Sequence, residues 1–348
     1  MPRKIVPYGL WLELDENDYC ADYTIRCGVV SGIYSEIYLF PLYFLRTFYR
    51  LPKRFKNWDL RPFGEQSLAY SLVGTRNFPK KFKQWHLRGK NGRTVAHEAI
   101  KYNKLPNDFE QWDLADKNGW TVAHEAAFLN RLPPGFNSWH LKDPSGCTVA
   151  HVAARNLRLP KDFEYWHLAD NSGWSVAHEA AKWRKLPDGF DKWDIKDNKG
   201  WSVAHEVASH GPLPKEFDKW DLADDRGWTV AHEAVYWGNL PATFDRWEIR
   251  DNSGVSVAHV AAKWKRLPES FDKWGIKDNR GRSVAHEAVS NGPIPKDFNK
   301  WTLADDHGWT VAHEAAKWGS LPKGFNRWDL IDNFGITVKE VFDKYLSR

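Results

Sequence analysis

The chain has little cysteine and no long apolar run. Only Cys20, Cys27 and Cys147 occur among its 348 residues, and they follow no regular spacing, so neither a disulfide framework nor a structural zinc site is indicated. The apolar stretch at residues 37–45 is much too short to span a bilayer. The basic start of the chain has no continuous apolar segment before Glu13, which argues against a signal peptide. These absences predict a cytoplasmic protein without a membrane segment.

An excess of charge of one sign is also lacking. The chain has 50 basic and 45 acidic residues and a net charge of +5, so its balance does not by itself imply a nucleic-acid partner. It contains no glycine-rich phosphate loop and no nucleophile elbow, and no pair of carboxylates stands out as catalytic. The sequence therefore predicts a protein that is not an enzyme and that holds no cofactor.

What the chain has in excess is tryptophan, with 21 residues, most of them periodic. An Ala-His pair returns every 27 positions, and nine histidines keep one register without a slip: His97, His124, His151, His178, His205, His232, His259, His286 and His313. A fixed period of this length predicts one elongated array of stacked repeats in place of separate globular domains. Each repeat is named below by its histidine.

The period divides the chain into four segments. Residues 1–35 do not fit it, and their strand-like runs at 8–14 and 23–30 predict a small β-hairpin that caps the array. Residues 36–92 hold two degenerate repeats, residues 93–335 nine regular repeats, and residues 336–348 a C-terminal capping helix. Tyr43, Tyr70 and Glu340 stand at the histidine position of the flanking repeats, which gives twelve repeats in all.

Each regular repeat is predicted to fold as a turn, a helix and a second, short helix. In the His178 repeat, residues 170–173 have turn chemistry, Ser175 is a candidate N-cap, and residues 176–183 form an alanine-rich helix. In the following Leu-Pro-x-x-Phe-x-x-Trp segment, Pro187 suits the first position of a short helix whose apolar residues share one face. The eleven tryptophans of this segment are therefore predicted to lie in the core.

The start of each repeat resembles the ankyrin repeat. Residues 119–127, Gly-Trp-Thr-Val-Ala-His-Glu-Ala-Ala, are similar to the ankyrin pattern Gly-x-Thr-Pro-Leu-His-x-Ala-Ala, and they follow a matching turn, Asp116-x-x-Gly119. The resemblance covers residues 93–348 well and 36–92 weakly. It departs in the period, which is 27 residues against about 33, and in the Pro-Phe-Trp segment that replaces an aliphatic second helix. It is that of short, divergent ankyrin-like repeats of bacterial or phage type.

This resemblance implies an all-α repeat solenoid of ankyrin-like turn, helix and short-helix repeats. It also implies a non-enzymatic scaffold that binds another protein, and it indicates where the partner would bind. Carried over position by position, the binding residues are the tryptophan between Gly and Thr or Ser and the pair at the helix end. They are Trp120, Trp174, Trp201, Trp228 and Trp309 at the turn, Trp183, Trp237, Trp264 and Trp318 at the helix end, and Lys182, Lys263 and Lys317 beside them.

The histidines invite a metal or catalytic hypothesis, because His-Glu occurs in seven repeats. The zincin motif needs a second histidine four residues after the first, and no repeat has one. Neighbouring helices lie about 9 Å apart, which is too far for shared coordination of one zinc ion. A structural role, in which each histidine bonds the backbone of a turn, is therefore favoured over a metal site.

Two functional hypotheses stay open on the sequence alone, besides the less favoured one of an enzyme in residues 1–35, where so short a segment offers little room for a site. The nine tryptophans at the turns and helix ends of the regular repeats are either exposed binding residues or packed against one another. If they are exposed, an aromatic and basic groove of a monomeric array would capture a protein with an acidic or mixed surface and act by masking or scaffolding. Basic residues interleaved with the aromatics, Arg155 and Arg158 among them, give the alternative of single-stranded nucleic acid.

Overall fold

A computed structural model of the chain describes residues 58–59, 61, 66–76, 78–156, 159–292, 294–295 and 297–346, together with three short strands near the N-terminus. The chain divides into two compact units, Met1–Asn171 and Ser172–Arg348, which are treated separately below. The expectations for Tyr43 and for Arg158 lie outside the described residues.

The first compact unit begins with strands β1 (Arg3–Val6), β2 (Leu10–Glu13) and β3 (Gly28–Val29), which form an antiparallel sheet in the order β1-β2-β3. The β2–β3 pair joins the two runs that predict a hairpin, and β1 adds a strand that the sequence pattern does not indicate. The helical elements that follow are α2 (Leu68–Leu72), the 3-10 turn η1 (Lys90–Gly92), α3 (Val95–Lys101), α4 (Val122–Phe128) and α5 (Val149–Arg155). That residues 1–35 cap the array remains a prediction.

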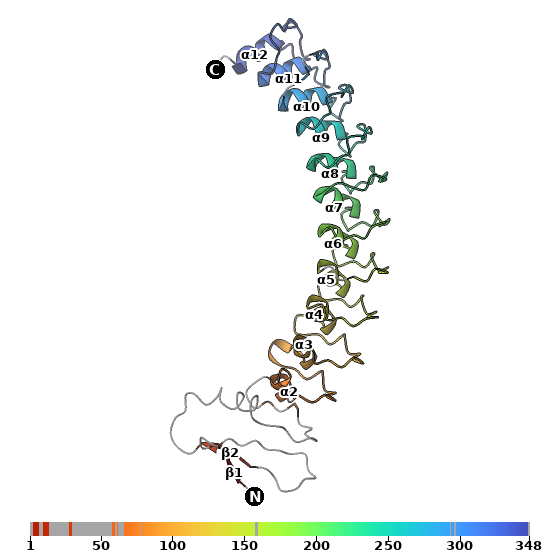
Figure 1. Cartoon of the computed structure of the whole chain (residues 1–348). Coiled ribbons are helices and arrows are strands. Elements are labelled where there is room, and N and C mark those ends of the chain that lie inside the picture. The colour runs from red at the N-terminus through yellow and green to blue at the C-terminus, as the bar shows by residue number, and fades with distance from the viewer. Residues whose placement is uncertain are drawn as a thin grey trace. The chain divides into compact units, whose positions relative to one another are not determined.

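The second compact unit is a run of single helices. These are α6 (Val176–Lys182), α7 (Val203–His210), α8 (Val230–Trp237), α9 (Val257–Lys263), α10 (Val284–Asn291), α11 (Val311–Trp318) and α12 (Val338–Leu346). Each helix contacts the next one along the chain, so they stack in sequence order, with the loops on one side of the stack (Figure 1). The structure is thus the all-α repeat solenoid that the period predicts.

Each regular helix begins at a capped position. In the His178 repeat the backbone N–H of His178 donates to the Ser175 hydroxyl at 3.3 Å, and the backbone N–H of Ser175 donates back to His178 Nδ1 at 3.2 Å. The same bond from the cap residue to Nδ1 is present in all nine regular repeats. In the last repeat Glu340 takes the place of histidine, and its Oε2 accepts the backbone N–H of Thr337 at 2.7 Å. The cap satisfies N–H groups that a helix start otherwise leaves without partners.

The other ring nitrogen of the histidine joins one repeat to the next. His205 Nε2 lies 2.9 Å from the carbonyl oxygen of Trp228, which is 23 residues further along the chain. Because Nδ1 accepts a backbone N–H, the proton is on Nε2, which donates to this carbonyl. Equivalent bonds of 2.9 or 3.0 Å start from His97, His124, His178, His232, His259, His286 and His313. The structural role predicted for the histidines is therefore confirmed.

Burial keeps these rings neutral. It lowers the pKa of His97, His124, His232, His259 and His286 below the ordinary value of 6.5, against the opposing effect of the carbonyl that each ring bonds. For His205 burial lowers the pKa to about 4. A neutral ring is the form that the bonding requires, because a protonated Nδ1 could not accept the backbone N–H.

Each turn also packs against the turn of the next repeat. Gly200 closes an Asp-x-x-Gly turn with φ +75°, a conformation that favours glycine. A Cβ atom at Gly200 would lie 2.8 Å from the backbone nitrogen of Asp225, so a side chain there would collide with the next turn. The backbone N–H of Asp225 donates to the carbonyl of Lys199 at 3.0 Å. Glycine is thus needed both for the turn and for the close approach of the repeats.

The predicted second helix is wrong. In the described residues the Leu-Pro-x-x-Phe-x-x-Trp segments contain no helix: each makes one turn after its proline and a second turn at its tryptophan, with irregular backbone between the two. In the His178 repeat the Phe190 N–H closes this turn by donating to the Pro187 carbonyl at 3.2 Å. Phe three residues after Pro therefore marks a turn, although the same spacing also suits one face of a helix.

The next repeat bonds to the end of the segment. The first N–H groups of α7 find partners on it: Val203 donates to the carbonyl of Ile195 at 3.0 Å, and Ala204 donates to the carbonyl of Trp193 at 3.2 Å. The segment thus provides hydrogen-bond acceptors for the first N–H groups of the helix that follows it.

Aromatic rings of the Pro-Phe-Trp segments form a continuous ladder inside each compact unit. Phe217 and Trp220 of one repeat meet edge to face at 5.0 Å, and Trp220 meets Phe244 of the next repeat at 5.4 Å. The order Phe, Trp, Phe, Trp continues in the second unit to Trp328 and ends on Phe342 of α12 at 5.1 Å. The described Trp residues of these segments are buried or half-buried, as the sequence predicts for a core.

Candidate binding surface

The turn tryptophans are half-buried and packed inside their own repeat. The Trp201 ring lies on the His205 ring with the centroids 4.7 Å apart and the planes tilted by 32°. The same arrangement, with centroids 4.8 to 5.0 Å apart, holds for Trp120, Trp174, Trp228 and Trp309. Each of these five indoles also donates its Nε1–H to the glutamate that follows the histidine. These residues therefore have a structural task that the sequence does not reveal.

The helix-end tryptophans are exposed. Trp183, Trp237, Trp264 and Trp318 have 50%, 52%, 44% and 57% of their surface accessible, and all four stand five residues after the histidine of their repeat. We call these four residues the helix-end row. Tyr102 occupies the same position in the first compact unit and is 44% exposed. The nine tryptophans that the sequence treats as one set thus separate into two environments.

A buried carboxylate holds three residues of the row in place. Glu233 Oε2 accepts the Nε1–H of Trp228 at 2.8 Å, and Glu233 Oε1 accepts the Nε1–H of Trp237 at 2.7 Å. We call this arrangement, in which one carboxylate accepts the Nε1–H groups of two tryptophans, a clasp. The same clasp binds Trp174 and Trp183 to Glu179, and Trp309 and Trp318 to Glu314. Each clasp fixes the edge of an exposed indole while its faces stay accessible to a partner.

Trp264 is held in another way. Its repeat has Val260 at the glutamate position, and the Trp264 ring packs edge to face against Tyr236 of the preceding repeat with centroids 5.0 Å apart. Tyr236 also meets Trp237 at 5.2 Å, so the three rings form one aromatic cluster across the α8 and α9 repeats. At the end of the row, the Lys317 ammonium lies 5.5 Å from the centre of the Trp318 ring.

The environment of the clasp carboxylates differs between repeats. Burial raises the pKa of Glu233, against the two indole donors and Arg226. Burial likewise raises the pKa of Glu206, which has only one indole donor, Trp201. At Glu314 burial acts in the same direction, but hydrogen bonds from Trp318, Ser290 and Trp309, together with Arg282, leave its pKa below the ordinary value. Glu314 thus differs from Glu233 by the added Ser290 donor and the Arg282 cation, which help to hold its charged form.

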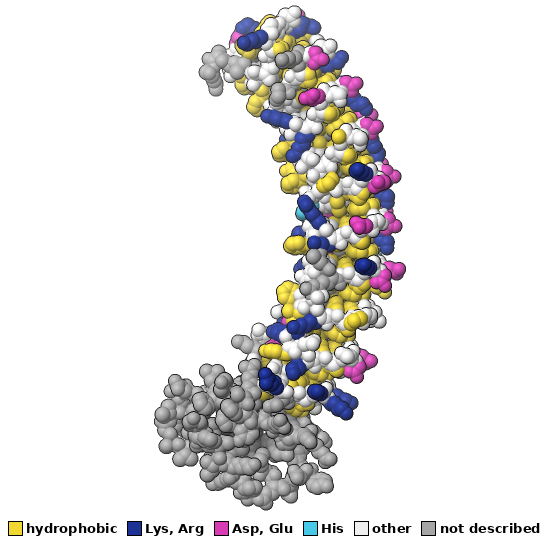
Figure 2. Space-filling model, viewed as in Figure 1, with side chains coloured by type: hydrophobic (Ala, Val, Ile, Leu, Met, Phe, Trp, Pro, Cys, Tyr) yellow, Lys and Arg dark blue, Asp and Glu magenta, His cyan; other side chains and the backbone are white. Residues whose placement is uncertain are grey.

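Charge is distributed unevenly around the repeats. Figure 2 shows hydrophobic side chains together with Lys and Arg along the edge where the helices lie, and Asp and Glu mainly along the edge formed by the loops. The residues that flank the row agree: Lys182, Arg184, Lys263 and Lys265 are all exposed. In the nine regular repeats no Asp or Glu occurs from four to seven residues after the histidine. The helix ends therefore present cations and aromatics without acidic side chains.

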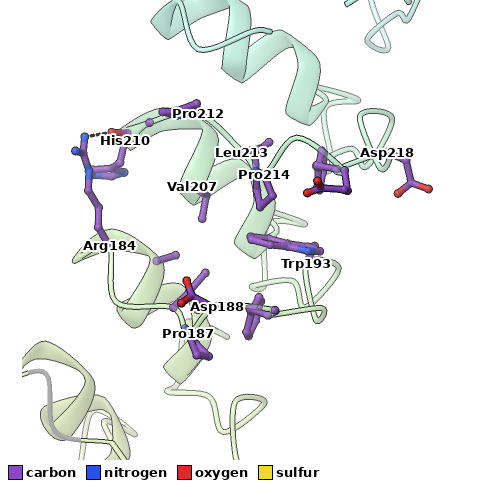
Figure 3. A pocket seen from close by; sticks show the side chains of 17 residues that line it. Arg184, Pro187, Asp188, Trp193, Val207, His210, Pro212, Leu213, Pro214 and Asp218 are labelled. Carbon is purple, nitrogen blue, oxygen red and sulfur yellow. Dashed lines mark hydrogen bonds between the residues drawn. The ribbon is translucent and has the colours of Figure 1, made fainter. Parts of the chain in front are cut away.

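A cavity of 690 Å³ adjoins this edge between the His178 and His205 repeats. Its walls include the apolar Pro187, Trp193, Val207 and Leu213, together with charged side chains such as Asp188. Figure 3 shows Arg184 at the rim, where its guanidinium donates to the backbone carbonyl of His210. A second cavity, of 520 Å³, lies between the His286 and His313 repeats and has Trp318 in its lining.

Searches for other kinds of site gave two findings. Within the part of the chain that the structure describes, no three His, Cys, Asp or Glu side chains gather closely enough to hold a metal ion. No helix of the described residues is both long and apolar enough to cross a membrane. The candidate surface is the edge that carries the helix-end row, because the exposed tryptophans lie on it.

Comparisons with known proteins address the fold. A scan against protein-family models gave no match, and neither did a search of curated proteins. A search of solved structures matched the crystal structure of a domain of Bcl-3, a protein described as a unique member of the IkappaB family. That structure is an ankyrin repeat domain. The match has 18% sequence identity and a TM-score of 0.34, and covers 59% of this chain and 100% of that chain.

From the His124 repeat onward, each regular repeat combines the Asp-x-x-Gly turn and the capped helix, and it has no second helix in the described residues. The sequence analysis missed the clasp glutamates, Glu179, Glu233 and Glu314, as part of the surface. The spacing Trp-x4-Glu-x3-Trp, which occurs in those three repeats, is the signal that could have indicated them.

Proposed function

We propose that the chain is a non-enzymatic scaffold that binds another protein through the helix-end row and the cations beside it. The observation that carries the proposal is the row itself: four tryptophans, each about half exposed, at one position of the repeat. Large aromatics of this kind dominate binding energy at protein interfaces, and a monomeric surface seldom presents several together. Binding along the row would mask the partner or hold it on the scaffold.

Preorganisation supports this proposal. An exposed tryptophan that moved freely would lose side-chain entropy on binding, about 0.5 to 1.5 kcal/mol for each immobilised side chain. In three members of the row the Nε1–H is already bonded to a buried glutamate, and in the fourth the ring is already packed on Tyr236. Part of this cost is therefore met in the free protein.

The twelve residues indicated by the ankyrin resemblance then take different roles. The helix-end tryptophans, with Lys182, Lys263 and Lys317, would contact the partner. Trp174, Trp228 and Trp309 would act as positioning residues, because each holds a glutamate that also holds a row indole. Trp120 and Trp201 hold glutamates whose repeats have no tryptophan at the helix end. The half-buried rings of all five turn tryptophans on the histidines favour such roles over direct contact.

The test compares two variants of the full chain as baits in lysate of the source organism, with the retained proteins quantified by mass spectrometry. The row variant carries Ser at Trp183, Trp237, Trp264 and Trp318. The matched control carries Ser at Ile331 and Phe334, which are 60% and 73% exposed in a loop away from the helix ends. Thermal unfolding checks that both variants are folded.

We expect a defined set of proteins that the wild type and the control retain and that the row variant loses. An identical set on all three baits would contradict the proposal. If only nucleic acid is retained, and its affinity falls steeply with salt, the surface binds nucleic acid instead of protein.

A further inference from the structure

The spacing of basic residues at the helix ends bears on the chemistry of the partner, and the inference drawn from it rests on the proposed function. In the second compact unit two helix ends are strongly basic, Lys182-Trp183-Arg184-Lys185 and Lys263-Trp264-Lys265-Arg266. They are three repeats apart. The two repeats between them have Ser209-His210-Gly211-Pro212 and Tyr236-Trp237-Gly238-Asn239 at the same positions, with no Lys or Arg. We call the two basic segments the first and second basic cluster.

Both clusters are open to solvent. All eight of their side chains are exposed. Across the residues that the structure describes, none of their six cations forms an ion pair. Cations of the Pro-Phe-Trp segments do form ion pairs, such as Lys219 with Asp194 and Lys273 with Glu248. Cations held close together without counter-charges repel one another, and an anionic partner would relieve this repulsion.

The backbone shows that a cation is kept where glycine would fit better. Arg184 and Lys265 follow their helices with φ +56°, in the left-handed region. Gly238 and Gly319 occupy the same position in other repeats, with φ +80° and +69°. A residue with a side chain is disfavoured in this conformation. Arg184 uses this position within the fold, because its guanidinium donates to the carbonyl of His210 in the next repeat. The Lys265 ammonium makes no such bond among the described residues, so a charge at a strained position is there available to a partner.

The spacing of the clusters defines the length of the ligand. Helices that pack side by side are about 9 Å apart, so three repeats separate the clusters by about 27 Å. An extended peptide covers this distance with about eight residues, at roughly 3.4 Å for each residue. We propose that the two clusters are equivalent subsites for one extended peptide segment of the partner, in which two groups of Asp or Glu stand about eight residues apart.

The stretch between the clusters favours a peptide over nucleic acid. A single strand carries a phosphate at every nucleotide and is best matched by a continuous line of cations. Between the clusters, the helix ends instead offer the exposed Trp237, the half-buried Tyr236 and uncharged polar groups. Such a surface fits apolar residues between two acidic groups of a peptide.

The experiment uses synthetic peptides and the full chain. Each double peptide carries two Asp-Glu-Asp triplets joined by a proline linker, which acts as a stiff spacer of about 3.1 Å for each residue. The distance between triplet centres is set to about four, nine or fourteen residues, and a peptide with one triplet is the reference. Affinity is measured by titration calorimetry at low and at moderate salt.

We expect the affinity to peak at about nine residues and to exceed that of the single triplet at least about tenfold, because the second contact becomes intramolecular. The variant Lys263→Ala/Lys265→Gly should lose this peak and bind all peptides like the single triplet. Glycine at position 265 also removes the strained side chain, so the variant should unfold at the same or a higher temperature. The control Lys192→Ala/Lys199→Ala changes the charge equally away from both clusters and should keep the peak.

Affinity that does not depend on the spacing would overturn the inference while leaving protein binding by the row untouched. So would the failure of every acidic peptide to bind to a chain that still retains its protein partners through the row. Tighter binding of a single-stranded oligonucleotide than of the best peptide would replace the peptide with nucleic acid, and would contradict the proposed function as well.

Discussion

Lowering the pH from 7 to 5 should destabilise the array, because its buried histidines are neutral in the folded state. His205 is the clearest case: its folded pKa is about 4, whereas the ordinary value is 6.5. Between these values the unfolded chain binds more protons than the folded one, so the stability conferred by the neutral ring is complete above pH 6.5 and is lost as the pH falls towards 4. At pH 5 the loss from this residue is about 2 kcal/mol, at about 1.4 kcal/mol for each pH unit below 6.5.

Five other histidines act in the same direction, since burial lowers the pKa of His97, His124, His232, His259 and His286 as well. Two glutamates act against them: the raised pKa of Glu206 and Glu233 stabilises the folded state as these carboxyls take up protons. Six histidines against two glutamates make a net loss of stability the expected result.

The assay is urea unfolding at pH 7.5, 6.5, 5.5 and 5.0, followed by circular dichroism. The midpoint should fall steadily below pH 6.5. In the control His205→Gln, the amide can still accept the cap N–H but no longer titrates, so its midpoint should be lower than that of the wild type at pH 7 and should change less towards pH 5. A wild-type midpoint that stays constant or rises between pH 7 and 5 would refute the assignment of the neutral histidines.

Three further predictions concern single residues, each measured as the free energy of unfolding in urea. Gly200→Ala should cost about 2 kcal/mol or more, because of the positive φ and the collision with Asp225, and a neutral effect would mean that the turns are not in contact. Trp193→Ala should cost about 3 kcal/mol by opening the aromatic ladder, and a cost below about 1 kcal/mol would show that the ladder is not a core. Glu233→Ala should cost about 1 to 3 kcal/mol and free the Trp237 indole, which would lower its fluorescence anisotropy. Glu233→Gln keeps one acceptor, so its effect should be smaller. Equal behaviour of the two variants would argue against the clasp.

The sequence predicted the features that depend on local spacing. The period located the helices, and Ser or Thr three residues before each histidine indicated a capped helix start with a structural ring, as at Ser175 and His178. The features it missed depend on the neighbouring repeat. Pro187 and Phe190 have a spacing that suits either a helix or a turn. In the structure they form a turn, and the N–H groups of Val203 and Ala204 in the next repeat donate to carbonyls at the end of the segment.

The residues of the candidate surface also divide into features that the sequence predicted and features that it missed. Sequence position placed Trp174 and Trp183 in one set, because both lie outside the core segment. The structure separates them: Trp174 rests on His178, and Trp183 stands half exposed at the helix end. Both bond one carboxylate, that of Glu179, which the sequence analysis considered only as part of a His-Glu pair. Burial and shared partners of this kind follow from the packing of the folded repeat and cannot be obtained from composition or period.

The most direct test of the central claim is hydrogen exchange of the scaffold with and without its captured partner, read by mass spectrometry. If the partner binds along the helix-end row, backbone amides at the C-terminal ends of α6, α8, α9 and α11 should exchange more slowly in the complex. The Asp-x-x-Gly turns and the Pro-Phe-Trp segments should keep their free rates. Protection confined to those turns and segments, with the helix ends unchanged, would contradict the account.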